Sequence, residues 1–305
     1  MQGIPVADSK TPAWYAARNS GFGSSEIAAV AGLSQYQTPY EVFLRKTGQL
    51  PEFEGNDATR LGTKLEPVIV SEFVEATGIE AKQYPCPMLR HSQHSFLYAT
   101  PDALLVTDEV LECKATGWRI AKDQYGDDGT DDIPTEHLCQ TQLQLEVTGL
   151  DVAHLACLVD GRNLRLFVVR KNLELIARLI YAAAELWARI QKNDPPSPDW
   201  GHDTTLGVIK TLYGSIDEGK IVSLSDEARD AWSRYEVLGK EEKAAKEQRE
   251  KEKARVLSEI GDAGAGDLGD GRCVRRKEIG ATTVSYERKA YIDARATKLD
   301  SWMKG

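Results

Sequence analysis

Apolar residues recur at two spacings along this chain, and together these spacings predict a mixed α/β fold. Apolar residues three and four positions apart indicate helices, whereas short apolar runs bounded by turn residues indicate strands. The helical spacing predicts helices that begin at Thr11-Pro12 and Thr38-Pro39, a long helix closed by Gly78, and helices over 27–31, 133–147 and 172–190. The strand-like runs cover 79–84, 96–99, 103–106, 110–114, 152–159 and 164–169.

The order of these elements predicts helices packed on a central mixed sheet. The runs 152–159 and 164–169 flank Asp160-Gly161 and are expected to form a hairpin. The helix over 172–190 is expected to pack onto the sheet through its apolar stripe, Leu175, Leu179, Ala183 and Leu186. The acidic segment 115–134 is expected to be a loop. Strands flanked by helices in this order indicate an α/β sandwich.

A change of composition divides the chain near Pro195-Pro196-Ser197-Pro198. Residues 1–198 are predicted to form the core domain, and residues 199–305 an extension. The extension should contain one helix over 225–260, about 50 Å long if unbroken. Two short runs, 272–279 and 283–289, are predicted to pair as a hairpin after it.

Composition and charge exclude several classes of protein. The chain has 305 residues, 41% of them hydrophobic, and a formal net charge of −9. No apolar run approaches the roughly 20 residues of a membrane helix, and the first residues lack the pattern of a signal peptide. Five scattered cysteines without a CxxC pair fit a reducing cytoplasm. A DNA-binding protein this acidic must concentrate its basic residues along one channel.

The stretch from Pro101-Asp102 to Glu112-Cys113-Lys114 carries the strongest candidate chemistry. Residues two apart on a strand point to the same face, so Glu112 and Lys114 project together. Asp102 reaches them if the two strands pair as a hairpin. Carboxylate oxygens suit Mg²⁺ or Mn²⁺, which polarise a phosphodiester and generate hydroxide, while the lysine positions the water or stabilises charge. The alternative for so short a motif is a strand edge with solvated charges.

Four further side chains have both a functional and a purely structural interpretation. Glu66, on the long helix, is a candidate for an additional metal-site carboxylate or a solvated helical residue. Gln140 and Gln144 share one face of the helix over 133–147. One amide of this helix is a candidate for holding the attacking water or a phosphate oxygen, and Gln142 is a candidate DNA contact; a polar helix face is the simpler alternative.

Two groups of basic residues are candidates for binding nucleic acid. Arg18 offers a bidentate fork, and Ser25 lies in a glycine-containing loop at the start of a small helix, so the two are candidates for an anion pocket suited to a terminal 5′-phosphate. A capping serine with a surface arginine is the alternative. Arg275 and Arg276 belong to a basic run in the acidic chain, which is a candidate contact for DNA or for an acidic neighbouring subunit.

The order of these motifs resembles a known family. The spacing Pro101-Asp102-x9-Glu112-Cys113-Lys114 is similar to the signature of the PD-(D/E)xK nuclease superfamily. The ordered set resembles the YqaJ-type viral recombinases, relatives of phage lambda exonuclease, over about residues 10–195. It comprises Trp14-x3-Arg18-x2-Gly21-x-Gly23-Ser24-Ser25-Glu26, Leu33 to Tyr40, Gly62-x3-Glu66-Pro67, Tyr98 to Asp102, Leu111 to Thr116, and Gln140-Thr141-Gln142-Leu143 with Val147-Thr148-Gly149.

The resemblance implies a restriction-endonuclease-like core and a 5′→3′ exonuclease on double-stranded DNA ends that needs Mg²⁺ or Mn²⁺. Within it, Asp102, Glu112 and the carbonyl of Cys113 look like metal ligands, with Glu66 near the metal. Lys114 resembles the catalytic lysine and Gln140 the assisting glutamine, and Arg18 and Ser25 look like the clamp on the 5′-phosphate. A homo-oligomeric ring, a single-strand annealing partner and the cytoplasm of a bacterial or phage-infected cell are also implied. Ser24 stands where many relatives have glycine.

Two other functions remain open on the sequence. One is a structure-specific or nicking endonuclease on the same core, which would cut closed circular DNA. The other is a non-catalytic module that binds DNA ends and recruits a recombination partner. The complete set of Asp102, Glu112 and Lys114 favours an enzyme over a pure binder, because binding alone does not need groups that generate hydroxide.

Overall fold

The computed structural model describes residues 2–51, 55–217, 219–281, 283 and 294. The chain forms two compact units, Met1–Gly214 and Ser215–Gly305. The first unit therefore extends past the predicted boundary at Pro198. It includes one further helix, in which Val208 is buried in the same apolar cluster as Leu186.

The elements of the first unit follow the predicted order, with additions. Its strands are β1 (Ile4–Ala7), β2 (Phe22–Gly23), β3 (Ala81–Gln83), β4 (Met88–Arg90), β5 (Leu97–Ala99), β6 (Ala103–Leu105), β7 (Val110–Thr116), β8 (Val152–Val159) and β9 (Asn163–Arg170). Its helices are α1 (Pro12–Asn19), the 3-10 turn η1 (Ser24–Glu26), α2 (Ile27–Val30), α3 (Pro39–Lys46), α4 (Asp57–Thr77), α5 (Trp118–Gln124), α6 (Thr135–Thr148), α7 (Leu173–Lys192) and α8 (Thr205–Leu212).

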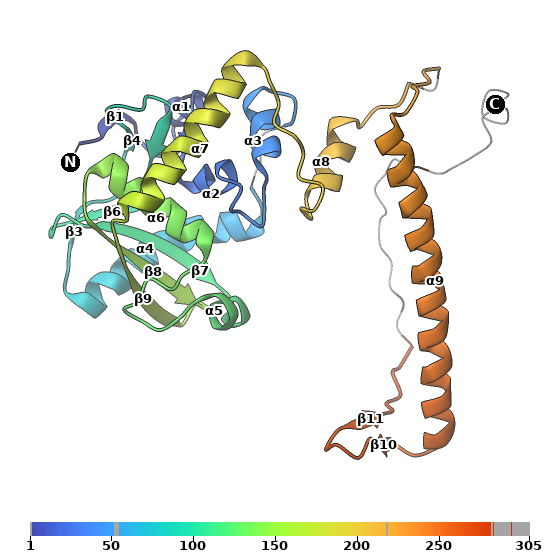
Figure 1. The fold of residues 1–305 in the computed structure, drawn as a ribbon. Coiled ribbons are helices and arrows are strands. Elements are labelled where there is room, and N and C mark those ends of the chain that lie inside the picture. Colours follow the sequence, from blue (N-terminus) through green and yellow to red (C-terminus); the bar gives the residue numbers. More distant parts are fainter. Residues whose placement is uncertain (1, 52–54, 218, 282, 284–293, 295–305) are drawn as a thin grey trace. The chain divides into compact units, whose positions relative to one another are not determined.

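A five-stranded mixed sheet forms the centre of this unit, in the order β3-β6-β7-β8-β9 (Figure 1). The pair β7–β8 is parallel, and the other pairs are antiparallel. The predicted hairpins β6–β7 and β8–β9 are both confirmed. The predicted α/β architecture with a central mixed sheet flanked by helices is therefore confirmed.

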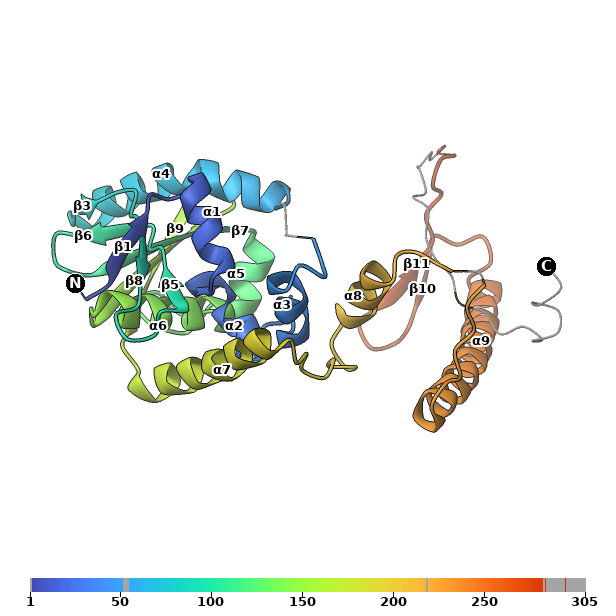
Figure 2. The same cartoon turned by 90° about the horizontal axis from the view of Figure 1, so that it is seen from above.

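Helices cover both faces of this sheet, and the alternation of side chains along β7 assigns each residue to one face. Leu111 packs with Ile69 and Phe73 of α4. Val110 packs on the opposite face, in a cluster with Leu145 of α6. In Figure 2, α4, the sheet, α6 and α7 follow one another as layers. The even-numbered residues of β7 therefore face α6, and this parity directs Glu112 and Lys114 toward the same helix.

The sheet prediction was incomplete, because the first unit contains a second, four-stranded sheet in the order β1-β4-β5-β2. Only β5 of this sheet was predicted. Its other strands have two to four residues, which is too short for a clear alternation of apolar and polar positions. Two sheets therefore replace the single predicted one.

Two other expectations were wrong in detail. The segment 115–134 is not all loop, because α5 follows β7 after Gly117 and buries Ala121 against the sheet cluster. Helix α7 does not cover the five-stranded sheet directly. It packs mainly on α6 and α2, and its buried Leu179 and Ala183 share a cluster with Leu97 of the four-stranded sheet.

Side-chain caps set the starts of the longer helices. The hydroxyl oxygen of Thr38 accepts a hydrogen bond from the Glu41 amide at 3.2 Å before α3. The side-chain oxygens of Asn56 and Asn172 do the same for α4 and α7. Helix α6 ends at Gly149, whose φ of 72° is a left-handed conformation that favours glycine.

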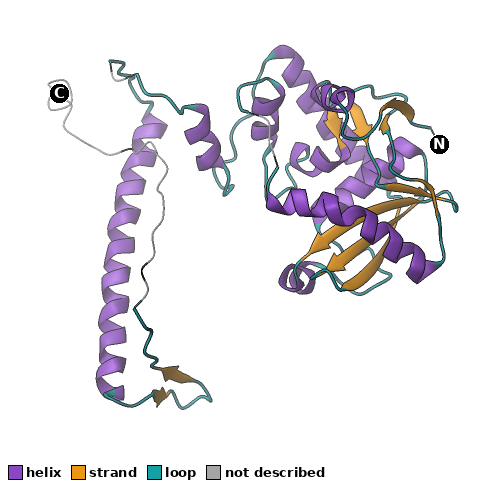
Figure 3. Ribbon diagram, turned by 180° about the vertical axis from the view of Figure 1, so that it is seen from behind, coloured by secondary structure: helices purple, strands orange, loops and turns teal. Residues whose placement is uncertain are grey.

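The second unit consists of a long helix and a small hairpin (Figure 3). Helix α9 (Asp226–Ile260) confirms the predicted long helix, and β10 (Ala265–Asp267) pairs with β11 (Cys273–Arg275). β11 thus pairs with the glycine-rich link that precedes it, and its predicted pairing with 283–289 stays a prediction. Of that run, all but residue 283 lies outside the described residues.

The described helices include none long and apolar enough to cross a membrane. The five cysteines are free thiols.

Glu146 on α6 provides a pH-dependent test of this fold. Its carboxylate pairs with Lys171 at 2.8 Å and with His91 at 3.3 Å. Burial raises the pKa of Glu146, but the bonds from Lys171 and His91 outweigh it and the net pKa is lowered. A lowered pKa stabilises the fold above the unfolded-state pKa of about 4.5, and this contribution is lost as pH falls through the folded-state pKa.

Glu146→Gln is therefore expected to lower the free energy of unfolding by about 1–2 kcal/mol at pH 7, with the difference shrinking below pH 4.5. Urea unfolding at several pH values measures this. Glu75→Gln, at an exposed position of α4, is the matched control. An equal effect of both substitutions at all pH values would contradict the assignment.

Candidate active site

The β6–β7 hairpin brings Asp102 to the second motif, as predicted from the spacing. Ala103 lies opposite Leu111 in the register of this pair. Asp102 therefore lies just before β6. Its carboxylate accepts a hydrogen bond from the Cys113 amide of β7 at 2.7 Å, in place of the backbone carbonyl of a paired strand. The hairpin thus fixes a carboxylate at the edge of β7.

Glu112 is the most enclosed charged group of the site, with 2% of its surface exposed. Lys114 donates to its Oε1 atom at 2.6 Å, as the shared strand face predicts. Gln140 of α6 donates from Nε2 to the same oxygen at 2.6 Å and accepts from Lys114 at 3.0 Å. Glu112, Lys114 and Gln140 therefore form one connected network.

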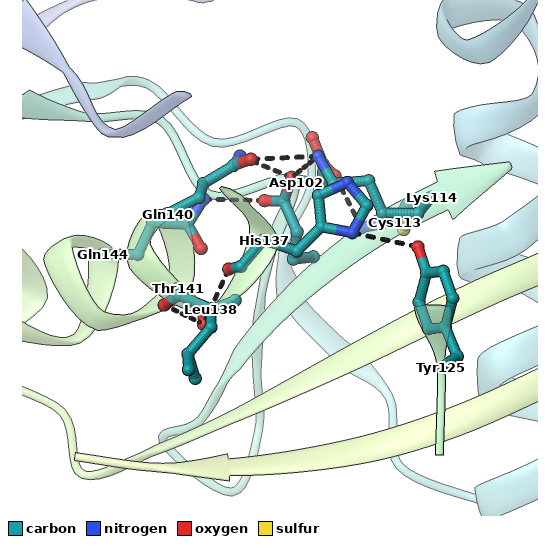
Figure 4. A network of polar contacts seen from close by, with 10 residues as sticks. Asp102, Cys113, Lys114, Tyr125, His137, Leu138, Gln140, Thr141 and Gln144 are labelled. Atoms are coloured by element: carbon teal, nitrogen blue, oxygen red, sulfur yellow. Dashed lines mark hydrogen bonds and ion pairs between the residues drawn. The ribbon is translucent and has the colours of Figure 1, made fainter. Parts of the chain in front are cut away.

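A second glutamine of α6 completes this network (Figure 4). Gln144 lies one helical turn after Gln140 and donates from Nε2 to Oε2 of Glu112 at 2.6 Å. Its own carbonyl oxygen, Oε1, is buried and has no hydrogen-bond partner among the described residues. An unsatisfied buried acceptor costs about 1–3 kcal/mol.

The enclosed charges shift one another's proton affinities. Burial and the neighbouring Glu112 carboxylate raise the pKa of Asp102 well above its usual value, against the opposing effect of Lys114. Burial lowers the pKa of Lys114, but Glu112 and Asp102 outweigh it, so the net pKa is raised and the lysine remains a cation. Two carboxylates that repel each other beside one ammonium group form a site that attracts a further positive charge.

His137 and Tyr125 form a separate hydrogen-bonded pair, whose imidazole senses the charge of Lys114, and the sequence analysis missed both. Nδ1 of His137 lies 2.9 Å from the hydroxyl of Tyr125. Burial and the nearby Lys114 lower the pKa of His137 to about 3, so its imidazole is neutral. The only signal in the sequence is the position of His137 one helical turn before Gln140.

Glu66 approaches the site from the face opposite Glu112, because α4 packs on the other side of β7. Its negative charge contributes to the raised pKa of Asp102. Its Oε2 atom also lies 3.2 Å from Nζ of Lys10. Glu66 is therefore close enough to influence Asp102, and it is already paired with a cation.

Arg18 and Ser25 lie on either side of Gly23, as the loop motif suggested. A Cβ atom at Gly23 would be 3.9 Å from the Ser25 hydroxyl and 4.0 Å from Nε of Arg18. Nη2 of Arg18 is 3.8 Å from Oε2 of Glu26, and its guanidinium lies over the ring of Trp14. This cluster is called the anion pocket below.

Lys46 is a further member of the anion pocket that the sequence analysis missed. Its ammonium group lies 3.0 Å from Glu26 and 2.8 Å from the backbone carbonyl oxygen of Arg18. Its side chain is 7% exposed. Lys46 is the last residue of α3, so only the tertiary fold brings it to this loop.

Short contacts connect the anion pocket to the Asp102 strand. The Trp14 indole donates to the Thr100 hydroxyl, two residues before Asp102, at 3.1 Å. A Cβ atom at Gly21 would lie 2.3 Å from the carbonyl oxygen of Phe96, so only glycine allows this approach. Gly21 thereby places the loop against β5, the strand that leads to Asp102.

The donor set at the β7 edge fits a hard divalent cation. Asp102 and Glu112 supply carboxylate oxygens. The N–H and C=O of one residue in an extended strand point to the same side, so the carbonyl of Cys113 shares the edge that faces Asp102. No three His, Cys, Asp or Glu side chains of the described residues are close enough to hold a metal alone. Mg²⁺ accepts such a set, because it retains water and binds substrate phosphate oxygens.

Part of this chain matches a known protein family. Residues 13–151 match the family described as the YqaJ-like viral recombinase domain. The resemblance inferred from the ordered motifs is therefore confirmed. The uncharacterized protein YqaJ of Bacillus subtilis (strain 168) is 26% identical over 262 residues, which cover 84% of this chain and 80% of that protein.

Solved structures of exonucleases are also similar to this chain. An alkaline exonuclease from Laribacter hongkongensis is 22% identical, with a TM-score of 0.49, over 60% of this chain and 94% of that chain. A phage-related exonuclease from Haemophilus somnus 129PT is 12% identical, with a TM-score of 0.43, over 57% of this chain and 94% of that chain.

The matched segment contains every predicted site residue of the first unit, but one of them is not available to DNA. Gln142 is 1% exposed. Its Nε2 donates to the Arg170 carbonyl at 2.8 Å, and its Oε1 accepts from the Asn172 amide at 2.8 Å. Gln142 therefore joins α6 to the start of α7, and its prediction as a DNA contact was wrong because the residue faces inward.

Arg275 and Arg276 lie outside the matched segment, in the second unit. Both are exposed, at the end of β11. The basic run around them also contains Arg272, Lys277 and Arg288. Arg272 pairs with Asp270 at 2.6 Å, and Arg288 lies outside the described residues.

Proposed function

We propose that this chain is a metal-dependent deoxyribonuclease that degrades duplex DNA from its 5′ ends and leaves 3′ single-stranded tails for recombination. The supporting observation is the enclosed network of Asp102, Glu112, Lys114 and Gln140 at the edge of β7. Carboxylates and an ammonium group in one enclosed site suit phosphodiester hydrolysis. The match to the YqaJ-like viral recombinase domain supports a role in recombination.

Asp102, Glu112 and the Cys113 carbonyl would hold Mg²⁺ or Mn²⁺, with Glu66 nearby. When bound, the cation supplies Lewis-acid polarisation of the scissile phosphate. Lys114 remains protonated because Glu112 and Asp102 raise its pKa. Its ammonium group donates to the attacking water or to the phosphate oxygen on which charge develops. Gln140 contacts both Lys114 and Glu112 and keeps the ammonium group in place.

The anion pocket is proposed to bind the 5′-terminal phosphate. Arg18 supplies a guanidinium fork, Ser25 a hydroxyl, and Lys46 a second positive charge. Glu26 neutralises these cations without DNA, since it lies within 4 Å of both. A phosphate group carries more negative charge than the carboxylate and can compete with it for the cations.

The proposal also includes a homo-oligomeric ring around the DNA and a single-strand annealing partner, as the resemblance implies. Arg275 and Arg276 are exposed cations of the second unit that suit contact with the DNA backbone.

The first test compares three substrates with Mg²⁺: linear duplex DNA with 5′-phosphate, the same DNA with 5′-hydroxyl, and a covalently closed circle. Degradation of the linear DNA from its 5′ ends is expected, fastest with phosphate. Lys114→Gln should slow cleavage at least about 100-fold, because it removes the charge at the reacting phosphate. Lys192→Gln, at an exposed position of α7, is the control.

Cleavage of the closed circle would instead indicate an endonuclease. Tight binding of DNA ends by the unmodified protein without cleavage of any substrate would indicate a recruiting module.

Arg18→Gln tests the anion pocket. The variant is expected to lose about 10-fold in rate on 5′-phosphorylated ends and to change little on 5′-hydroxyl ends, because only the phosphate uses the charged fork. Initial rates on both substrates give the ratio of the rate on 5′-phosphorylated ends to the rate on 5′-hydroxyl ends. Arg178→Gln on α7, whose guanidinium pairs only with Glu174 among the described residues, is the control. An unchanged ratio in Arg18→Gln would reject the pocket.

The double variant Arg275→Glu and Arg276→Glu tests the second unit. If both residues contact phosphates, DNA affinity falls and the slope of log affinity against log salt becomes shallower by about 2. Fluorescence anisotropy at several salt concentrations measures this slope. Lys240→Glu with Lys243→Glu reverses two exposed charges on α9 and serves as the control. The same slope in wild type and in both double variants would exclude the contact.

A further inference from the structure

Two glutamines of α6, two positions apart, are both enclosed but differ in how their amides are satisfied. Gln142 uses both ends of its amide in bonds to backbone groups. Gln144 is 0% exposed and uses only one end. Its Nε2 donates to Oε2 of Glu112 at 2.6 Å, while its Oε1 has no hydrogen-bond partner in the part of the chain that the structure describes.

Packing does not account for a glutamine at position 144. The neighbouring buried residues Leu143 and Leu145 are apolar. A methionine has nearly the same shape as glutamine and would fill the same space without leaving a buried oxygen unmatched. The feature that only the amide supplies is the N–H group directed at Glu112.

One oxygen of the Glu112 carboxylate, the oxygen to which Gln144 donates, can accept a further hydrogen bond or bind a cation. A carboxylate oxygen accepts about two hydrogen bonds. Oε1 already accepts bonds from Lys114 and Gln140. Among the described residues, Oε2 accepts one bond, from Gln144, which leaves one of its lone pairs free.

We propose that Gln144 is a positioning residue for divalent-cation binding: its amide fixes the orientation of Glu112 so that Oε2 presents its free lone pair to the cation. The inference rests on the proposed metal-dependent function. Groups that hold a metal-ligating carboxylate change metal affinity by 10- to 100-fold when they are removed. Gln144 acts through Glu112 and touches neither DNA nor the cation.

The test measures Mn²⁺ binding to the full chain by calorimetry, without DNA. Gln144→Met is expected to weaken Mn²⁺ binding 10- to 100-fold relative to wild type. The Mg²⁺ concentration for half-maximal cleavage should rise by a similar factor, while the rate at saturating Mg²⁺ changes much less. A role limited to stability would leave both metal dependences unchanged.

Gln142→Met is the matched control, because it also removes an enclosed amide from the same helix. It is expected to lower the melting temperature through loss of its bonds to Arg170 and Asn172, and to bind Mn²⁺ as wild type does. If Gln144→Met does not fold, Gln144→Asn is used in its place. The shorter asparagine side chain cannot bring its amide to Glu112, so this variant should also bind Mn²⁺ more weakly.

Wild-type Mn²⁺ affinity and Mg²⁺ dependence in a folded Gln144 variant would overturn the inference and leave the proposed function intact. A wild-type chain that binds no Mn²⁺ and cleaves no DNA would instead reject the proposed function, and the inference with it.

Discussion

The buried negative charge of Glu112 must be compensated, and this requirement constrains how the elements around it pack. Glu112 is 2% exposed, and a charge removed from water is strongly destabilising unless it is paired and hydrogen-bonded. Lys114 of the same strand and two glutamines of α6 provide that compensation. Helix α6 must therefore lie over β7 with its Gln140 and Gln144 face toward the sheet. The packing of α6, and through it of α7, follows from this requirement.

The same requirement explains why α6 is a buried helix with many polar residues. Gln140, Gln142 and Gln144 are all enclosed. Gln140 bonds to Lys114 and to Oε1 of Glu112, Gln144 bonds to Oε2 of Glu112, and Gln142 bonds to the backbone near α7. The helix consequently lacks a simple apolar stripe, although it is one of the central elements of the unit.

The sequence predicted the features that depend on local geometry. The hairpin that joins Asp102 to Glu112, and the common face of Glu112 and Lys114, follow from strand alternation and a short connection. The four-stranded sheet was not predictable, because its unpredicted strands have only two to four residues. The different roles of Gln142 and Gln144 were not predictable either, since a helical sequence does not show which side of the helix meets a carboxylate. Lys46 comes to the anion pocket from another helix, and no local pattern indicates this.

The two candidate sites differ in the stability of the backbone that carries them. Strand β7 has seven residues, is paired with β8 along its whole length, and is covered by helices on both faces. The anion pocket is built from short elements: α1 carries Arg18, β2 and η1 carry Gly23 and Ser25, and α3 carries Lys46. Amide hydrogen exchange follows such differences, because long, enclosed strands open only with the whole unit, whereas short elements open locally. Helix α1, which carries Arg18 and has no buried residue, can therefore adjust its position to an incoming strand end while the backbone around Glu112 stays closed.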